Sequence, residues 1–304
     1  RLCEEAGIPP GVVNVVTGFG PEVGEPLVNH PLVARVGFTG SEGGGRRVYE
    51  NAARNLKRVS LELGGKSANI VFEDANLDDA AKGVVSGIFA ATGQTCMAGS
   101  RLLVQSSIHD EVVKRLVDFM KSARLGDPFA SETNIAPVST QPQLEKVLYY
   151  IDVAKGEGAQ CVLGGERSKR PGCEKGLFVE PTIFVGVRND MRIAQEEVFG
   201  PVLSVIKFDT EEEAIAIAND SPYGLAAGVW TQNLQRAMTV PKRIHAGTVW
   251  VNAYRVVSYL APFGGVKASG IGRENGSRAI YEYLEAKSVF INSKPGVANP
   301  FVLS

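Results

Sequence analysis

The chain has 304 residues, of which 44% are hydrophobic and 21% charged, and its formal net charge is −1. This composition is typical of a globular protein with about two domains. The near-zero charge argues against capture by nucleic acid or by anionic lipid, so we expect neither as a partner. No apolar run approaches the roughly 20 residues that span a bilayer, and we expect no membrane partner.

The amino terminus has no signal peptide and no initiator Met. Residues 1–7 have the pattern of the last turns of a helix closed by Gly7, with Pro9 and Pro10 directly beyond. A domain does not usually begin in this way. We therefore expect the sequence to be part of a longer protein.

Four scattered cysteines, Cys3, Cys96, Cys161 and Cys173, show no C-x-x-C spacing, and the chain has three His in total. A His/Cys metal site is therefore not expected. Low cysteine usage of this kind is typical of a reducing compartment, and we expect the protein to be cytoplasmic.

The first quarter of the chain alternates short apolar runs with helical stretches. The expected elements are a strand at Val12–Val16, a helix at Pro21–Asn29, a strand at Val33–Phe38, a helix at Glu42–Ala53 and a strand at Val59–Leu63. This alternation predicts right-handed crossovers and a parallel sheet covered by helices.

Gly64 and Gly65 form the best candidate boundary, since two glycines let the chain turn sharply between units. The pattern then restarts. The further expected helices are Leu77–Ala91, His109–Ala123, Leu144–Glu157, Glu211–Asn219 and Leu234–Arg243. The further expected strands are Ala68–Phe72, Leu102–Gln105, Gln160–Leu163, Thr182–Val185, Leu203–Phe208, Ala227–Trp230 and Thr248–Asn252. The β-prone run Ala286–Ile291 lies near the end.

Cys96 is the first candidate for chemistry. A cysteine near small residues is often a buried packing residue. Here, however, Gly93, Ala98 and Gly99 leave room for a substrate to approach. A free thiol is mostly protonated at neutral pH, so a nucleophilic Cys96 requires an electropositive or hydrogen-bonding environment.

Glu62 is a carboxylate within an apolar strand, directly before the Gly64–Gly65 break. It could be an edge-strand residue that faces water. A position at the carboxyl end of a parallel strand is, however, where open α/β sheets bind ligands. Partial burial there would raise the pKa of Glu62 towards that of a useful general base.

Two strand-to-helix turns could bind a phosphate. The segment Thr17–Gly24 has Gly-x-Gly followed by three residues instead of two before the third glycine, which is a weak fingerprint. Phe38–Ser41 offers a hydroxyl and backbone N–H groups at a helix start, which suits a pyrophosphate, but Ser41 would serve equally as an N-cap. A third segment, Glu196–Pro201, could be a solvated loop or could hold a ribose hydroxyl and pack on a base.

Together these segments resemble the aldehyde dehydrogenase superfamily, and the match runs through essentially the whole chain. The matching motifs are Phe38-Thr39-Gly40-Ser41, Leu61-Glu62-Leu63-Gly64-Gly65-Lys66, Gly93-Gln94-Thr95-Cys96, Glu196-Glu197-Val198-Phe199-Gly200-Pro201 and Pro262-Phe263-Gly264-Gly265.

The resemblance implies an α/β fold in three parts. These are the remainder of a Rossmann-type NAD(P)-binding domain at residues 1–64, a thiol-bearing catalytic domain at 65–264, and a C-terminal segment with an oligomerisation strand at 265–304. It also implies NAD or NADP as cofactor, a small aldehyde as substrate, and a homodimer or homotetramer for the full-length protein.

By position, the resemblance makes Cys96 the catalytic nucleophile and Glu62 the general base. The implied cofactor contacts are Gly20, Pro21, Gly24, Phe38, Thr39, Gly40, Ser41, Leu63, Glu197 and Phe199. The implied lining of the aldehyde tunnel is Tyr254, Arg255, Tyr259 and Phe263. The implied reaction is oxidation of an aldehyde to a carboxylic acid through a Cys96 thiohemiacetal and a thioester, with Glu62 activating the hydrolytic water.

In the family, a longer N-terminal region precedes the segment matched here, and its Asn side chain completes the oxyanion hole. Loss of one oxyanion donor typically costs roughly 100- to 1,000-fold in rate, so we expect low activity from these 304 residues alone. A non-catalytic member of the same fold is the alternative, and Cys96 and Glu62 both argue against it. Arg255 could bind the carboxylate of a semialdehyde or could be an exposed salt-bridging residue.

Overall fold

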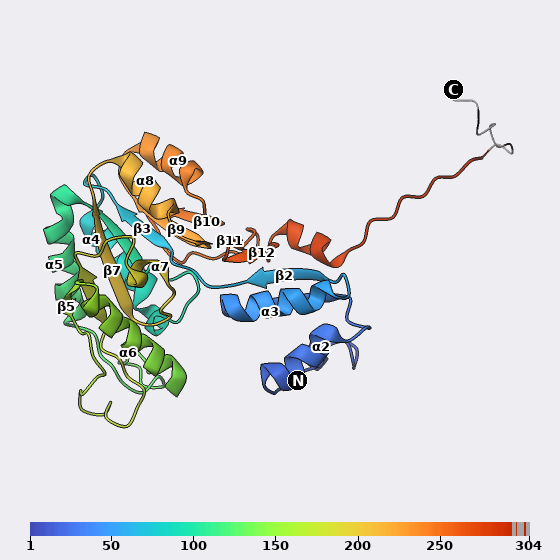
Figure 1. Cartoon of the computed structure of the whole chain (residues 1–304), viewed down its shortest axis with the longest axis horizontal. Helices are drawn as coiled ribbons and strands as arrows, with labels where there is room; N and C mark the ends of the chain where they lie inside the picture. Colours follow the sequence, from blue (N-terminus) through green and yellow to red (C-terminus); the bar gives the residue numbers. More distant parts are fainter. Residues whose placement is uncertain (294–295, 297–300, 302–304) are drawn as a thin grey trace.

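Two sheets organise the molecule, and the computed structural model describes residues 1–293, 296 and 301. One sheet has the strand order β1-β2-β12 and the other β10-β9-β3-β4-β7-β6-β5. Figure 1 shows them in two lobes, with helices α2 and α3 on the smaller sheet and α4 to α9 around the larger one. The mixed α/β architecture confirms the expected fold class.

The smaller sheet places Glu62 at its centre. Strands β1 (Arg35–Thr39) and β2 (Arg58–Glu62) are parallel, and β12 (Gly270–Ile271) pairs antiparallel with the other side of β2. Glu62 lies opposite Thr39 on one side and Gly270 on the other. The alternative of a water-facing edge strand is therefore wrong for Glu62.

Helix α3 (Glu42–Ala53) follows β1 and has the limits that the sequence predicts, with Ser41 as its N-cap. The expected helix at Pro21–Asn29 starts instead as a π-helical turn at Gly20–Gly24 and continues as α2 (Glu25–Asn29). A short helix α1 (Leu2–Glu5) precedes both.

The larger sheet carries the remaining expected strands within a few residues of their predicted limits. Its strands are β3 (Ala68–Val71), β4 (Arg101–Gln105), β5 (Gln160–Leu163), β6 (Thr182–Val185), β7 (Val202–Phe208), β9 (Ala226–Trp230) and β10 (Thr248–Val251). All neighbouring pairs are parallel except β5 with β6. A separate two-stranded ribbon joins β8 (Tyr223–Gly224) to β11 (Val266–Lys267).

The predicted helices of this lobe are present, and a short helix, α7, is one that the sequence pattern did not predict. The helices are α4 (Leu77–Ile88), α5 (His109–Met120), α6 (Gln141–Gly156), α7 (Arg192–Gln195), α8 (Glu211–Asn219) and α9 (Leu234–Arg243). Their apolar faces pack with the strands into buried clusters on both faces of the sheet, around Leu102, Val205 and Trp230 on one face and Ile70, Leu103 and Val229 on the other. This burial is the main stabilising term of the fold.

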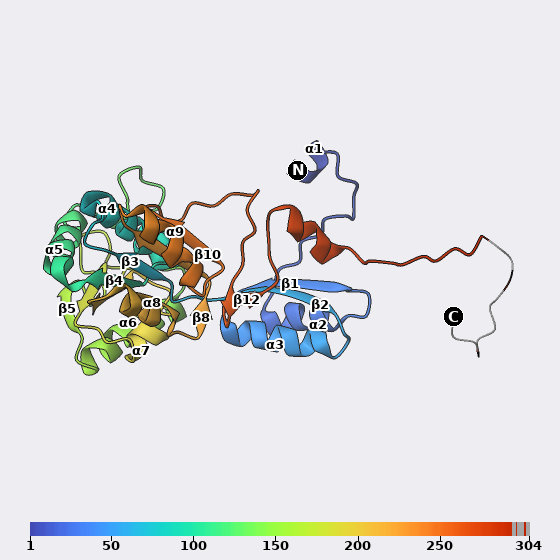
Figure 2. The ribbon, with the colours of Figure 1, turned by 90° about the horizontal axis from the view of Figure 1, so that it is seen from above.

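Two predicted β segments form no strand within the chain. Residues 12–16 lie in turns and irregular backbone, and Val15 is 85% exposed. Residues 286–291 run out from the smaller lobe in Figure 2, and Phe290 is 95% exposed. β-branched residues favour strands only where a neighbouring strand and a buried face are present, and neither run has them. Pairing of the C-terminal run with another copy stays a prediction, and residues 294–295, 297–300 and 302–304 lie outside the described residues.

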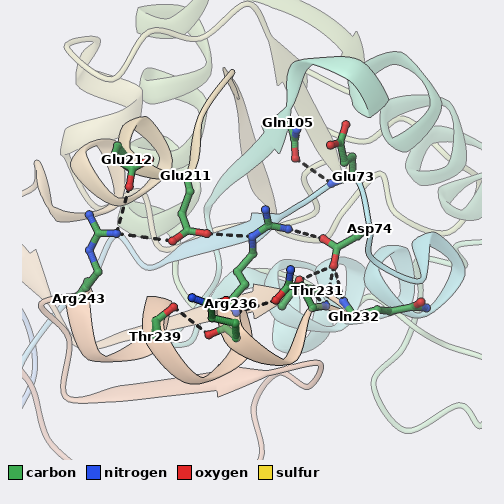
Figure 3. A network of polar contacts seen from close by, with 12 residues as sticks. Glu73, Asp74, Gln105, Glu211, Glu212, Thr231, Gln232, Arg236, Thr239 and Arg243 are labelled. Atoms are coloured by element: carbon green, nitrogen blue, oxygen red, sulfur yellow. Dashed lines mark hydrogen bonds and ion pairs between the residues drawn. The ribbon is translucent and has the colours of Figure 1, made fainter.

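A polar network ties the end of β3 to α8 and α9 (Figure 3). Asp74 accepts hydrogen bonds from the Thr231 hydroxyl at 2.7 Å and from the Gln232 and Asn233 N–H groups at 2.9 and 2.7 Å. Arg236 donates to Asp74 at 2.6 Å and to Glu211 at 3.0 Å. Asp74 thus accepts from two backbone donors at the start of α9. The Gln232 N–H has no other partner among the described residues, and the Asn233 N–H is shared with Thr231 Oγ1 at 3.1 Å.

Asp74→Ala should lower the free energy of unfolding by about 2–4 kcal/mol at pH 7, because it removes the acceptor of these bonds and leaves the Gln232 N–H unpaired. Burial opposes ionisation of Asp74, but the bonds from Thr231 and Asn233, with Arg236 nearby, outweigh it and lower the pKa. The stabilisation is therefore present above the ordinary Asp pKa and is lost as the pH falls through the lowered value.

Urea unfolding of wild type and variant at pH 7 and at pH 3 measures both effects. The matched control is Asp118→Ala on α5, whose partners Lys114 and Lys121 are exposed; it should have little effect on the free energy of unfolding. An Asp74→Ala penalty that is equal at the two pH values would contradict this account.

Candidate active site

A sharp turn at the end of α4 presents Cys96. Ala91, Thr92 and Gly93 have φ values of 52°, 56° and 67°, in the left-handed region that non-glycine residues adopt at a cost. A Cβ on Gly93 would lie 2.0 Å from the Gly200 carbonyl oxygen, so only glycine fits there. The chain then passes Cys96 and enters β4.

Glu62 lies at the carboxyl end of β2 and is 8% exposed. Neither carboxylate oxygen has a hydrogen-bond partner among the described residues. A Cβ on Gly264 would lie 2.7 Å from Oε1, so the side chain packs closely against the Gly264 backbone. A buried carboxylate without a partner is unfavourable for folding, and such groups concentrate at functional sites.

Burial raises the pKa of Glu62 to about 7, with a further increase from the Glu274 carboxylate and an opposing effect of Arg273. Glu274 is held by the Ser60 hydroxyl, which donates to it at 3.2 Å, and by paired backbone bonds of 2.7 Å with Phe263. The sequence argument missed Glu274. Only pairing of β12 with β2 brings it beside a residue more than 200 positions away.

Gly64 and Gly65 bring a second carboxylate to the site. The Gly65 N–H donates to Glu197 Oε1 at 3.0 Å, and a Cβ on Gly64 would lie 2.4 Å from Glu197 Oε2. A Cβ on Gly65 would lie 2.6 Å from the Cys96 carbonyl oxygen. Neither glycine has a positive φ. The pair is needed for close approach rather than for the sharp turn that we expected.

The two acidic residues of the Glu196–Glu197 pair have different partners. Glu196 forms an ion pair with Arg192 at 2.7 Å and accepts from the Tyr150 hydroxyl at 2.6 Å. Glu197 turns to the glycines beside Cys96. Burial raises the pKa of Glu197, and the Gly65 N–H opposes that rise.

We expected an electropositive or a hydrogen-bonding environment for Cys96, and the charged groups that act on it are carboxylates. Burial raises the pKa of its thiol, and the Glu197 and Glu62 carboxylates raise it further. The backbone N–H groups of Met97 and of Cys96 itself lower it. The hydrogen-bonding donors are therefore present, but the electropositive surroundings are not. The same carboxylates that flank the Gly64–Gly65 segment thus oppose ionisation of this thiol.

Four of the expected cofactor contacts line one apolar cavity of about 480 Å³. It lies between β1, α2 and α3, and its lining includes Gly20, Pro21, Gly24 and Phe38. An apolar cavity beside a sheet edge is suited to one part of a dinucleotide. The Glu197 carboxylate, at the Gly64–Gly65 segment that follows β2, could bind another part. The residues present therefore fit such a cofactor.

The other expected cofactor residues are placed as follows. Ser41 Oγ accepts from the Gly44 N–H at 3.2 Å, so it caps α3. Thr39 ends β1, and the Gly40 N–H donates to the Glu62 carbonyl at 3.1 Å. Leu63 is buried against Gly45. Phe199 has a φ of 58° and lines a small cavity with Glu197 and Thr95.

Of the expected substrate residues, Tyr254 contacts the segment that carries the thiol. It is buried, and its hydroxyl donates to the Met97 carbonyl at 3.0 Å. Arg255 Nη1 donates to the Ser86 carbonyl on α4 at 3.2 Å. Phe263 pairs with Glu274 beside Glu62. Tyr259 is 79% exposed, so its side chain is not packed against the other three.

Lys66 is a further buried group that the sequence argument missed. It is 2% exposed, and its Nζ has no hydrogen-bond partner among the described residues. Burial lowers its pKa to about 7, with Arg101 contributing in the same direction and Glu197 opposing. In the described part of the chain, no group of His, Cys, Asp and Glu is arranged to hold a metal ion, and no helix is long and apolar enough to cross a membrane.

Comparison with known proteins agrees with this geometry. The sequence profile of the Aldehyde dehydrogenase family matches residues 1–289. Betaine aldehyde dehydrogenase of Mesorhizobium japonicum is 48% identical over 99% of this chain and 61% of its own length. The putative aldehyde dehydrogenase DhaS of Bacillus subtilis is 47% identical over 96% and 58%.

Solved structures match equally well. Betaine aldehyde dehydrogenase of Staphylococcus aureus in complex with NAD+ superimposes with a TM-score of 0.96 at 44% identity, covering 99% of this chain and 59% of that one. Aldehyde dehydrogenase of Bacillus cereus in complex with NAD+ has a TM-score of 0.93 at 49% identity, covering 96% and 59%. The chain spans about 60% of the length of these relatives.

The Cys96 thiol is partly buried and the Glu62 carboxyl is buried, in a fold that matches NAD+-bound dehydrogenase structures. The chain belongs to the aldehyde dehydrogenase family.

The raised pKa of Glu62 has a measurable effect on stability. The protonated carboxyl is favoured in the folded state, so its contribution is fully present below the ordinary pKa of 4.5 and is lost as the pH rises through about 7. Compared with Glu62→Gln, the wild type should therefore lose about 2–3 kcal/mol of unfolding free energy between pH 4.5 and pH 8.

Urea unfolding of both proteins across this range measures the difference. Repeating it in a Glu274→Gln background should shrink the loss and end it at a lower pH, because one like charge is removed. Glu285→Gln, at an exposed position, should leave the profile unchanged. A wild-type profile parallel to that of Glu62→Gln would refute the raised pKa.

Proposed function

We propose that this chain is the thiol-bearing part of an NAD-dependent aldehyde dehydrogenase that converts an aldehyde to a carboxylic acid. The observation that carries the proposal is the convergence of Cys96, Glu62 and Glu197 on the Gly64–Gly65 segment. A nucleophile, a base with a pKa near 7, and a carboxylate able to hold a sugar hydroxyl are the groups that this reaction requires.

In the first step, the Cys96 thiol loses its proton to water, and the N–H groups of Met97 and Cys96 stabilise the thiolate. The sulfur attacks the aldehyde carbon, a C–S bond forms, and the C=O π electrons move to oxygen. The backbone N–H of Cys96 is the proposed donor to this oxyanion.

Bound NAD+ supplies the acceptor for the hydride that leaves when the oxyanion collapses to a thioester. Glu197 is placed to hold the nicotinamide ribose, since its Oε1 is already oriented by the Gly65 N–H. Phe199 lines the same small cavity as Glu197. NADP use, a cytoplasmic location, a homo-oligomer and the three-part domain division remain predictions.

In the last step, the oxygen of a water molecule attacks the thioester carbon while Glu62 accepts a proton from that water. The C–S bond then breaks, which releases the carboxylic acid and the Cys96 thiolate. The pKa of about 7 leaves a large fraction of Glu62 unprotonated at neutral pH. This hydrolytic base argues against transfer of the acyl group to coenzyme A.

A non-catalytic member of the fold is the second candidate. In that case Cys96 would remain unmodified when the protein is given NAD+ and an aldehyde. Iodoacetamide labelling is a weak discriminator, because the raised pKa of Cys96 makes slow labelling compatible with catalysis.

Single-turnover trapping tests the proposal. With NAD+ and butanal, Glu62→Gln should accumulate an acyl group on Cys96, because loss of a general base slows hydrolysis by about 10²- to 10⁴-fold while the nucleophile remains. Intact-mass measurement after acid quenching, with peptide mapping to Cys96, gives the yield.

Cys96→Ser should give no adduct, and Cys161→Ser, at a position on β5, should acylate like its parent. A Glu62→Gln protein that binds NAD+ yet never acquires the acyl mass would exclude the proposed reaction and favour the non-catalytic alternative.

A further inference from the structure

Arg255 is a partly buried cation with no acidic partner. Its Nη1 donates to the Ser86 carbonyl at 3.2 Å, and it forms no ion pair with any described residue. A guanidinium carries five N–H donors in a planar fork. Four of the five are therefore uncommitted in the described part of the chain.

The backbone around Arg255 is held on both sides. Tyr254 is buried with its ring against Gly87 and Gly99, where added Cβ atoms would lie 3.1 and 3.0 Å away. Trp250 Nε1 donates to the Val256 carbonyl at 2.8 Å. Arg255 itself has a φ of 63°, a conformation that costs about 1–2 kcal/mol for a non-glycine residue. Such strain persists where surrounding contacts impose it, and it concentrates at functional sites.

This segment contacts the loop that carries Cys96. The Tyr254 hydroxyl donates to the carbonyl of Met97, the residue next to Cys96. Ser86, which receives the Arg255 bond, lies on α4, and α4 continues through the turn Ala90–Gly93 to Cys96. Arg255 therefore connects the two segments that flank the nucleophile.

Further positive charge lies near Ser86. A cavity of about 510 Å³ between α4 and α5 is lined by Ser86 together with Lys82 and Arg124, and no Asp or Glu lines it. Asp79 is the acidic group nearest to Lys82, at 3.8 Å, and both side chains are exposed. The electrostatic field at this side of the site therefore attracts anions.

We propose that Arg255 is a specificity residue that binds the carboxylate of an aldehyde carrying an acid group at its far end, an ω-semialdehyde. The proposal rests on the proposed function. A carboxylate can take two parallel N–H bonds from the free side of the guanidinium, while its aldehyde end extends to Cys96.

The same charge disfavours the cationic substrate named for several relatives. Quaternary ammonium groups are bound over aromatic faces. Here the Tyr254 ring is packed against Trp250, with centroids 4.7 Å apart, and Tyr259 is largely exposed. Arg255 would also repel a trimethylammonium group. We therefore assign this chain a different substrate class from the betaine aldehyde dehydrogenases that it resembles.

The test compares rates of Cys96 acylation, measured by intact mass with NAD+, for succinic semialdehyde, butanal and betaine aldehyde. The wild type should favour succinic semialdehyde over butanal and butanal over betaine aldehyde. Arg255→Met should lower the ratio of the first two rates by about 10- to 100-fold, since a charge-assisted pair is lost. It should also raise the rate with betaine aldehyde relative to butanal.

Arg255→Lys should retain part of the preference, because the charge stays while the fork is lost. Arg124→Met, which removes a cation from the neighbouring cavity, should keep the ratio within about threefold. Equal loss with all three aldehydes in Arg255→Met would show a structural role and overturn the assignment. So would a wild type that does not prefer succinic semialdehyde. Failure of every aldehyde to acylate wild-type Cys96, butanal included, would instead refute the proposed function and this inference with it.

Discussion

The absence of side chains at Gly64 and Gly65 is the constraint on which the site depends. Glu197 lies where a Gly64 side chain would be, and the Cys96 carbonyl lies where a Gly65 side chain would be. Alanine at either position would push the carboxylate or the thiol loop away. Because Glu62 is only two residues upstream on β2, this close approach also sets the spacing between base and nucleophile.

Burial then acts on every ionisable group in this region. It raises the pKa values of Glu62, Glu197 and Cys96, and it lowers that of Lys66. All four changes have one physical cause, because a low-dielectric environment disfavours the charged form of each group. For Glu62 and Lys66 the result is a pKa near 7, where small changes in nearby charge alter the protonation state. In the proposed site, this burial favours proton transfer near neutral pH at the expense of stability.

Local patterning predicted most helices and strands because each has its own apolar periodicity and caps, as in α3 behind Ser41 and α8 behind Thr210. It failed at residues 12–16 and 286–291, where strand-forming side chains have no partner strand in the chain. It also missed Glu274, which reaches Glu62 only through β12, and Lys66, whose burial no local pattern reports. The role of the glycine pair was misjudged for the same reason: sequence shows that a side chain is missing but not what fills its place.

Linear order alone was sufficient to establish the family and the α/β layout, and it singled out Cys96 and Glu62 as the proposed chemical groups, since motifs and periodicity are local properties of a chain. The protonation states of Cys96 and Glu62 depend on folding. So does the placement of the Arg255 guanidinium, which has no acidic partner among the described residues. Electrostatic interactions and desolvation act through space, between residues that the chain brings together from β2, α4 and the segment after β10. For this protein, the family is therefore legible in the sequence, and the proposed preference among aldehydes rests on the three-dimensional arrangement.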